Sequence, residues 1–367
     1  MPVAGPAAVI SRRALLALAA GASCRAQSGV TREELPSEAK RYVDAATEFQ
    51  IIRLTEPAYD SYLTAPYNRG ISSHNFLVFS STRGGKLDAY RVDFKGGPWH
   101  RLTDAGRLDP ASLALVHDDR GICFIDGGSL RVVDFSRGRE HEAYAVEPPY
   151  EQLAAIALTR VPGQAYVVER RSGGSRIRLV SLLRKQVADV FESADEIGMP
   201  APRPGGGIAY RRGSLVAFCD QENNERSLPL APGKNGPFFW APDGGSLVYL
   251  NIPGKPGELN AIREYILASG QERLIAKTTQ FVDFAPNANG SVFVGASGSA
   301  ASPHVLILLR ATRRELTLCE HRARDPRNLA VAFAPNSQRV VFESDQHGRP
   351  AIYTMPVERF VEETETS

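Results

Sequence analysis

The sequence feature that most constrains the fold is a recurring turn followed by a strand. Its clearest copy is F-F-W-A-P-D-G-G-S-L-V-Y-L at 238–250, where an Asp-Gly turn separates two runs of β-forming residues. Aspartate and glycine tolerate the positive φ that a tight hairpin turn requires. Related A-P-N turns lead into strands at 291–296 and 339–344. These copies predict strands joined by short turns.

Further strands of the same kind precede these three. Turn-led strands without the proline are expected at 76–80, 121–126, 164–169 and 215–219. The chain then holds about seven such strands, mostly about 40 to 50 residues apart. A period of this size with several strands per repeat is typical of a β-propeller. We therefore predict an all-β chain whose residues 48–356 form a single seven-bladed β-propeller of WD40- or TolB-like repeats.

A strand near the N-terminus is expected to close the ring. The sequence E-F-Q-I-I-R-L-T at 48–55 has the composition of a strand and precedes the first full repeat. Such a strand can join the last blade of a propeller, which removes open sheet edges. We therefore expect 48–55 to contact the blade at 331–356.

The segments on either side of the repeats lack this pattern. Residues 27–47 are predicted to be a helical lead-in, because Ala39 and Val43 have helical spacing and Ser37 is placed to cap a helix. The tail at 357–367 is acidic and polar, and is expected to fray.

The first 26 residues are predicted to be an export signal. Ser11-Arg12-Arg13 precedes an apolar stretch at 14–22 that is too short to span a membrane as a helix. The pair resembles a twin-arginine signal, with cleavage expected near Ala22 or Ala26. Cys24 in A-G-A-S-C gives an alternative, lipid-anchored form. The expected location is periplasmic or extracellular, with membrane attachment only through Cys24.

Net charge bears on the class of binding partner, and cysteine content bears on whether disulfides stabilise the fold. The net charge is +2, so nothing favours nucleic acid or an acidic membrane surface as a partner. Cys123, Cys219 and Cys319 lie in or beside apolar runs, and an odd number argues against a disulfide framework. We expect them to be small buried hydrophobic residues.

No catalytic motif stands out from the residues alone. The seven histidines lie far apart, and none forms an H-x-H or H-x-x-x-H pair. The sequence has no G-x-S-x-G motif, no P-loop and no zinc-type cysteine spacing. The residues by themselves therefore predict an exported propeller of unstated function.

A resemblance to a known family adds to this interpretation. Three segments carry the resemblance through their order along the chain and their spacing. They are G-M-P-A-P-R-P (198–204), V-A-F-C (216–219) and F-W-A-P-D-G (239–244). They resemble the oligogalacturonate lyases, propeller-fold polysaccharide lyases related to TolB-like repeats. The resemblance extends from about Arg53 to Pro356. It implies β-elimination on short galacturonides during pectin degradation.

The implied reaction sets out what the site must contain. It removes the C5 proton of a galacturonide, α to a carboxylate, and expels the glycosidic oxygen. This chemistry needs a base of near-neutral pKa and positive charge at the carboxylate. In the family the base is a histidine directly after A-F-C. Manganese is held there by a histidine before an E-F-W run and by Q-x-x-H-P-H before the last P-D turn.

This chain departs from the family pattern at most of these positions. Asp220 follows A-F-C in place of the histidine, and Pro237 occupies the position of the metal ligand in the fifth blade. The remaining ligand positions fall on Asp325, Asn328 and Ala330. Too few donor atoms remain for a comparable metal site, so no metal and no other cofactor is expected.

Four residues remain candidates for a site. Arg203 is kept in the R-P motif, and the resemblance gives it a carboxylate-facing role. Asp220 is a candidate acid or base, and Arg226 and His321 are candidate ligand contacts. Each also has an ordinary structural interpretation as a loop, turn or strand-end residue. Arg203, Asp220 and Arg226 are expected to line one funnel if the resemblance carries the site across.

Three functions remain open at this stage. The leading hypothesis is a lyase-like propeller without the base and metal ligands, a pseudoenzyme that binds an acidic oligosaccharide or a protein partner. The second is an active oligogalacturonate lyase with a relocated site. The third is a TolB-like protein-interaction propeller. An aspartate of pKa about 4 is a poorer base than an imidazole of pKa about 6.5, which favours the first hypothesis.

Overall fold

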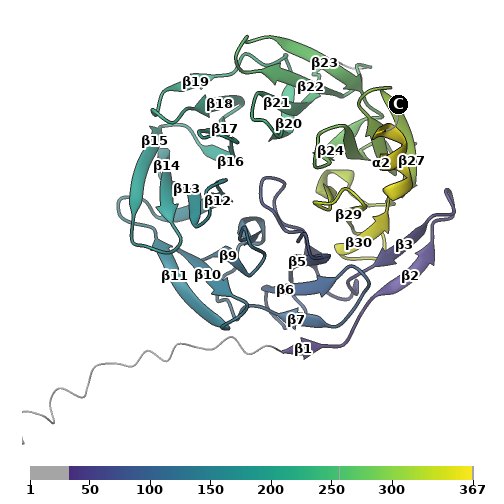
Figure 1. Cartoon of the computed structure of the whole chain (residues 1–367), viewed down its shortest axis with the longest axis horizontal. Coiled ribbons are helices and arrows are strands. Elements are labelled where there is room, and N and C mark those ends of the chain that lie inside the picture. Colours follow the sequence, from purple (N-terminus) through teal and green to yellow (C-terminus); the bar gives the residue numbers. More distant parts are fainter. Residues whose placement is uncertain (1–32, 256, 366–367) are drawn as a thin grey trace, which may run out of the picture.

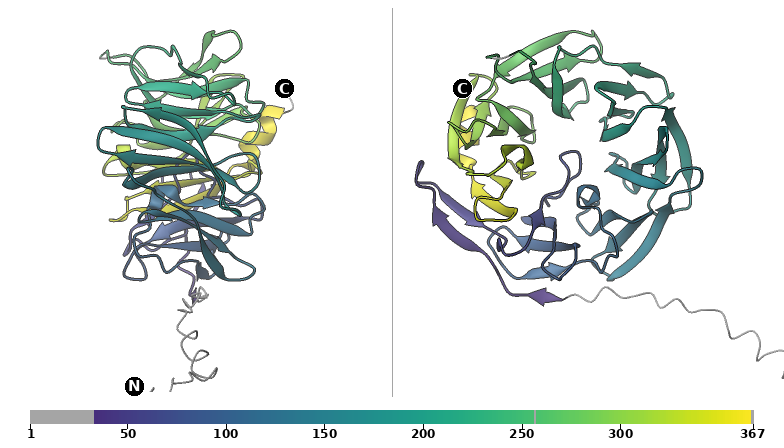
Figure 2. Two further views of the ribbon diagram at one scale, coloured as in Figure 1. Left: turned by 90° about the vertical axis from the view of Figure 1, so that its left-hand side faces the viewer. Right: turned by 180° about the vertical axis from the view of Figure 1, so that it is seen from behind.

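Seven antiparallel sheets surround a common axis. The computed structural model describes residues 33–255 and 257–365, and the predicted export signal at 1–26, Cys24 included, lies outside them. The sheets of the described part each contain four or five strands and are arranged radially (Figure 1). The views in Figure 2 show the ring edge-on and from behind. The predicted all-β, seven-bladed propeller is confirmed.

The first three blades follow one another along the chain, each with its first strand innermost. Blade 1 consists of β4 (Ser61–Tyr62), β5 (Phe76–Ser81), β6 (Asp88–Asp93), β7 (Trp99–Arg101) and, at its outer edge, β1 (Glu34–Leu35). Blade 2, preceded by the 3-10 turn η1 (Pro110–Ser112), consists of β8 (Ala114–Leu115), β9 (Gly121–Asp126), β10 (Ser129–Asp134) and β11 (Arg139–Ala145). Blade 3 consists of β12 (Gln152–Leu158), β13 (Gln164–Arg171), β14 (Gly174–Ser181) and β15 (Val187–Ser193).

The next three blades keep the same order. Blade 4 consists of β16 (Ile197–Pro202), β17 (Ile208–Arg212), β18 (Leu215–Cys219) and β19 (Glu225–Ser227). Blade 5 consists of β20 (Lys234–Trp240), β21 (Ser246–Ile252), β22 (Ala261–Ile266) and β23 (Glu272–Lys277). Blade 6 consists of β24 (Phe281–Pro286), β25 (Val292–Ser297), β26 (His304–Leu309) and β27 (Arg314–Glu320).

Blade 7 combines both ends of the chain and closes the ring. After the 3-10 turn η2 (Pro326–Asn328), it consists of β28 (Ala330–Phe333), β29 (Arg339–Ser344), β30 (Ala351–Pro356), β3 (Gln50–Arg53) and β2 (Lys40–Val43). Ile52 and Arg53 of β3 pair with Thr354 and Tyr353 of β30. The predicted contact between 48–55 and the last blade is therefore confirmed.

The helical lead-in predicted at 27–47 is wrong in the part that the structure describes. Lys40–Val43 forms β2, paired with β3, and Ser37 donates its hydroxyl to the carbonyl of Gly96 at 2.5 Å. A helix here would have no partner for an apolar face, since Val43 is 61% exposed. Pairing with an outer sheet edge instead satisfies the backbone groups and covers that edge.

The acidic tail is helical where it is described. Helix α2 (Glu358–Glu365) follows β30, and Val357 and Val361 are buried in the cluster between blades 6 and 7. The expected fraying therefore does not hold for Glu358–Glu365, because apolar side chains in the tail pack against the propeller. None of the helices in the described part is long and apolar enough to cross a bilayer.

The A-P-D-G turn locks two neighbouring blades together. The N–H of Gly244 donates to the carbonyl of Ala241 at 2.8 Å, and Gly244 has a φ of +70°. A side chain at Gly244 would collide with the carbonyl of Pro204 in the equivalent loop of blade 4. Glycine is therefore required both by the backbone conformation and by the close approach.

Apolar clusters fill the spaces between adjacent blades. Ile51 of β3, for example, lies in the cluster shared by blades 6 and 7. Full burial of such a side chain stabilises the fold by about 1.5–3 kcal/mol. Cys123, Cys219 and Cys319 are buried and unpaired within these layers, as predicted.

Candidate functional site

A hollow lies at the centre of the ring. It has a volume of about 440 Å³, and part of its lining comes from AB loops, the name we give to the loops joining the first and second strands of blades 2 to 6. We call it the central pocket. Because every blade directs its AB loop to the same end of the axis, residues far apart in sequence meet there.

One segment of blade 1 also enters this space. Residues 63–71, which we call the inner loop, lie between β4 and β5 and reach into the middle of the ring (Figure 1). The side-chain amide of Asn68 donates to the carbonyl of Ala111 at 3.1 Å. Arg69 pairs with Asp119 at 2.6 Å. On the opposite side, the N–H of Leu63 donates to a carboxylate oxygen of Glu343 at 2.9 Å.

Three arginines and one histidine line the central pocket. They are Arg69, His117, Arg160 and Arg310, and among the described residues no aspartate or glutamate lines the pocket. A low-dielectric hollow lined by one sign of charge attracts ligands of the opposite sign. The pocket therefore favours an anion.

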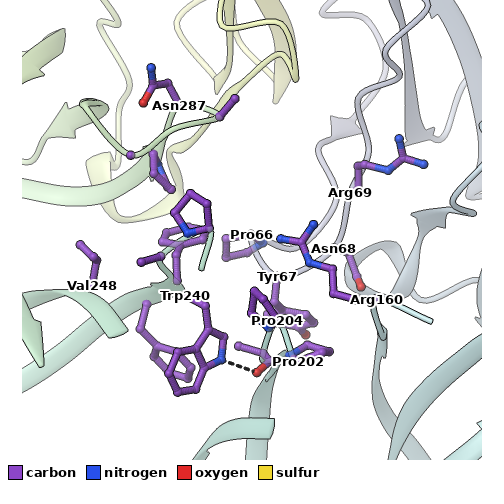
Figure 3. Close-up of a pocket in the computed structure, with 18 of the residues that line it drawn as sticks. Pro66, Tyr67, Asn68, Arg69, Arg160, Pro202, Pro204, Trp240, Val248 and Asn287 are labelled. Atoms are coloured by element: carbon purple, nitrogen blue, oxygen red, sulfur yellow. Dashed lines mark hydrogen bonds between the residues drawn. The ribbon is translucent and has the colours of Figure 1, made fainter. Parts of the chain in front are cut away.

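The three arginines differ in what already neutralises them. Arg69 is paired with Asp119 at 2.6 Å, and Arg310 with Glu264 at 2.7 Å. Within the described ranges the guanidinium of Arg160 forms no ion pair and no hydrogen bond. In Figure 3 the Arg160 side chain extends into the pocket, whereas Arg69 points away from its centre. Of the three arginines, Arg160 is therefore the one whose charge no described residue neutralises, so it can bind an anionic ligand.

His117 lies on the AB loop of blade 2 and Arg160 on that of blade 3. Partial burial lowers the pKa of His117 below its usual value of 6.5, and the charges of Arg69 and Arg160 lower it further. A hydrogen bond to the backbone of Thr159 opposes this shift. The imidazole is therefore mostly neutral at pH 7.

Aromatic side chains form the opposite part of the wall. The indole N–H of Trp240 donates to the carbonyl of Ala201 at 2.9 Å, drawn as the dashed line in Figure 3. That bond fixes the ring, whose centroid lies 5.5 Å from that of Phe218. Tyr67 of the inner loop also lines the pocket, and burial raises its pKa to about 12, so its hydroxyl stays protonated. A fixed indole beside basic groups suits a sugar acid, because the apolar face of a pyranose packs on aromatic rings.

Three of the residues singled out from the sequence gather in blade 4, outside the lining of the central pocket. The guanidinium of Arg203 lies 5.8 Å from the rings of both Phe218 and Trp240, and its Nε donates to the carbonyl of Gly244 at 2.7 Å. Arg226 lies 5.9 Å from the Phe218 ring. Asp220 accepts hydrogen bonds from the N–H groups of its own turn, which lower its pKa. Arg203 therefore packs near the Trp240 ring and does not itself line the central pocket.

His321 lies apart from that group and is fully buried. Its Nδ1 accepts from the N–H of Ala323 at 3.1 Å, so its Nε2 donates to the carbonyl of Ser297 at 2.9 Å. Burial lowers the pKa of His321, so the ring is neutral. With both nitrogens satisfied by backbone groups, the geometry gives His321 a structural role.

The positions of the family's metal ligands do not fit manganese. Pro237 and Ala330 have no donor atom in their side chains. Asp325 precedes η2 and Asn328 is its last residue, and no cluster of three or more histidine, cysteine, aspartate or glutamate side chains suited to a metal occurs in the described part of the chain. Manganese prefers several oxygen or nitrogen ligands in one shell.

A smaller hollow of about 190 Å³ lies on the other side of the inner loop. Ala330 and Asp283 line it. Burial raises the pKa of Asp283 to about 7, and that of nearby Glu343 to about 8. Asp283 accepts from the N–H of Val331 at 2.9 Å. Asp283 and Glu343, whose pKa values are raised to near neutral pH, thus lie in the region of Ala330, the position of a metal ligand in the family.

The basic residues that line the central pocket were not identified from the sequence, although Trp240 and Pro204 lie in segments that carry the family resemblance. Arg160 and His117 belong to loops without a motif, and neither lies near a residue that carries the family resemblance. Only the position of these two residues relative to the strands of the repeat could have identified them. Both residues come directly after, or within two residues of, the first strand of a blade, and such positions face the axis of a propeller.

Comparison with known proteins supports the same fold. No family model matches the sequence. The chain is 20% identical to an oligogalacturonide lyase of Pectobacterium atrosepticum in an alignment that covers 88% of this chain and 97% of that protein.

Two solved structures are similar over most of the molecule. An oligogalacturonate lyase in complex with manganese superposes with a TM-score of 0.82 at 19% identity, covering 91% of this chain and 100% of the other. An oligogalacturonate lyase from Vibrio parahaemolyticus gives a TM-score of 0.80 at 18% identity, covering 89% and 98%. With the blade order and the ring closure described above, these matches identify the chain as a β-propeller with the fold of the oligogalacturonate lyases.

Proposed function

We propose that this propeller binds a short acidic saccharide in its central pocket and lacks the metal-dependent lyase reaction of the proteins it resembles. One observation carries the proposal: in the part of the chain that the structure describes, the pocket is lined by three arginines and a histidine, and by no carboxylate. A galacturonide offers a carboxylate on each ring and an apolar pyranose face. The pocket offers the cationic Arg160 and the indole of Trp240.

The replaced family positions support binding without turnover. Pro237 and Ala330 supply no metal ligands, and Asp220 stands where the family has its histidine. A divalent metal contributes several kcal/mol of transition-state stabilisation in such a reaction. Without it, the scaffold can still bind the substrate class through charge and stacking.

Calorimetry with matched ligands tests the binding proposal. Digalacturonate and the neutral α-1,4-galactobiose differ only in their two carboxylates. We expect heat of binding with digalacturonate in EDTA and none with galactobiose at the same concentration. Equal binding of the two would contradict a charge-based site, and absence of binding at millimolar digalacturonate would favour a protein partner instead.

A second candidate function is β-elimination in the same pocket without manganese. The observation that favours it is His117, whose lowered pKa gives a neutral imidazole beside Arg69 and Arg160 at pH 7. A neutral base next to a carboxylate-binding cation is the pairing that removal of an α-proton requires. Formation of unsaturated product from digalacturonate in EDTA, abolished by His117→Asn, would establish this function in place of simple binding.

We also propose that the protein is exported through the twin-arginine signal at residues 11–22. Replacing Arg12 and Arg13 together with lysine should retain the protein inside the producing cell, because the route reads the arginine pair. Arg25→Lys is the matched control. Cell fractionation gives the readout, and unchanged export of the double variant would contradict the proposal.

A further inference from the structure

Among the described residues, the central pocket contains one arginine, Arg160, whose guanidinium has no protein partner. Arg69 is held by Asp119 and by the carbonyl of Val116, and Arg310 by Glu264. Arg160 has no such partner among the described residues, although it lines the pocket. A guanidinium binds a carboxylate through two parallel N–H···O bonds, which requires that its fork is not already occupied.

His117 lies beside this arginine through a backbone link. The hydrogen bond from its ring to the backbone of Thr159 joins the AB loop of blade 2 to that of blade 3, one residue before Arg160. The charged groups that act on His117 are Arg69 and Arg160, together with Asp118 of its own loop. Two of these are cations and one is an anion, so the net field of these groups on the imidazole is positive.

We propose that Arg160 and His117 form a proton-linked carboxylate subsite between blades 2 and 3. This inference rests on the proposed binding of an acidic saccharide. One uronate carboxylate pairs with the guanidinium of Arg160, and the sugar ring extends towards Trp240 on the other side of the pocket (Figure 3). The subsite differs in position from Arg203 and Asp220, which the family resemblance had suggested.

A bound carboxylate changes the balance of charge around His117. It offsets Arg69 and Arg160, so protonation of the ring becomes easier in the complex than in the free protein. Binding therefore takes up a proton in the pH range between the two pKa values of His117, and affinity rises as the pH falls through that range. A difference of one pKa unit corresponds to a roughly tenfold change in affinity.

Other titrating groups nearby make a variant comparison necessary. Asp283 and Glu343 lie around the smaller hollow behind the inner loop, and their pKa values of about 7 and about 8 fall in the same range. Tyr67 does not titrate there, because its pKa is about 12. The contribution of His117 is therefore the part of the pH dependence that His117→Asn removes.

The test is calorimetric titration with digalacturonate in EDTA, at several pH values from 5 to 8, in two buffers of different ionisation enthalpy. For the wild type we expect affinity to rise about tenfold from pH 8 to pH 5, with proton uptake seen as a buffer-dependent heat. His117→Asn should remove both effects. Arg160→Met should lower affinity at least about tenfold at every pH, and Arg160→Lys should restore part of it, because lysine keeps the charge but loses the fork.

Arg226→Met is the matched control, since Arg226 carries the same charge and lies outside the pocket lining. It should bind like the wild type, and thermal unfolding should show all four variants folded. If the wild type binds digalacturonate but Arg160→Met and His117→Asn match it at all pH values, the subsite is wrong and the proposed function stands. If the wild type binds no digalacturonate, the proposed function fails and the subsite fails with it.

Discussion

At the scale of single residues, burial separates the roles of histidines that look alike in the sequence. His321 is fully buried, and both of its nitrogens are bonded to backbone groups. His117 lines the central pocket beside two arginines. Nothing in the flanking sequence distinguishes them, because burial depends on segments distant in the chain, such as Ser297 beside His321.

His321→Phe should destabilise the protein and leave ligand binding intact. The substitution leaves the N–H of Ala323 and the carbonyl of Ser297 buried without partners, at a cost of about 1–3 kcal/mol each. Urea denaturation measures the change, with His74→Gln as the control, because the His74 side chain is 73% exposed. The control should change the free energy of unfolding by less than about 0.5 kcal/mol. An equally small effect of His321→Phe would contradict the structural role.

Two buried carboxyl groups should make stability fall as the pH rises. The pKa values of Asp283 and Glu343 in the folded protein, about 7 and about 8, lie above the value of about 4 expected in the unfolded chain. The folded state therefore binds more protons between pH 4 and these values, so the free energy of unfolding decreases as pH rises through that window.

Glu343→Gln should flatten this decrease, since glutamine keeps an oxygen that accepts from the N–H of Leu63 and cannot ionise. Denaturant unfolding at pH 5, 6.5 and 8 gives the slope. The variant should gain stability relative to the wild type at pH 8 and much less at pH 5. Glu151→Gln, an exposed site, serves as the control. The same slope in the Glu343→Gln variant as in the wild type would show that Glu343 is ionised in the folded protein.

At the scale of elements, the turn-led strands were predictable and the N-terminal lead-in was not. The A-P-D-G and A-P-N turns carry their own backbone requirements, such as the positive φ of Gly244, so local sequence identifies them. Lys40–Val43 becomes a strand only because β3 lies beside it, after β3 has joined a blade almost 300 residues away. Spacing within the segment carried no information about that partner.

The closing strand should contribute strongly to stability. Ile51 is fully buried in the cluster between blades 6 and 7, so Ile51→Ala should cost about 2–5 kcal/mol through lost burial and a cavity. Val43→Ala, on the neighbouring strand but 61% exposed, is the control and should cost less than about 0.5 kcal/mol. Chemical denaturation distinguishes the two. A loss of stability no larger than that of the control would mean that the ring does not depend on β3.

The AB loops explain why the site was harder to predict than the fold. Arg160 and His117 are separated by about 40 residues and share no motif. They meet because neighbouring blades direct equivalent loops to the same end of the axis. Family resemblance pointed instead to Arg203, which the structure holds against Gly244 and the ring of Trp240. A position relative to the blade repeat was a better guide here than a short motif.

At the scale of the whole molecule, this chain has the scaffold of its relatives, and we propose that it lacks their chemistry. The blade order, the ring closure and most of the length agree with oligogalacturonate lyases. The metal-ligand positions do not, since Pro237 and Ala330 offer no donor atoms. What the ring retains is a central hollow lined by basic and aromatic residues. Such a hollow suits recognition of an acidic sugar without the electrophile that a lyase of this family requires.

The most direct test of this account follows binding and turnover of digalacturonate in the same samples. Calorimetry gives the affinity, and ultraviolet absorbance follows unsaturated product, in EDTA and again with added manganese. We predict the same affinity under both conditions and no product in either. Product formation that depends on manganese would contradict the central claim, because it would require a metal site that the residues at the family positions do not provide.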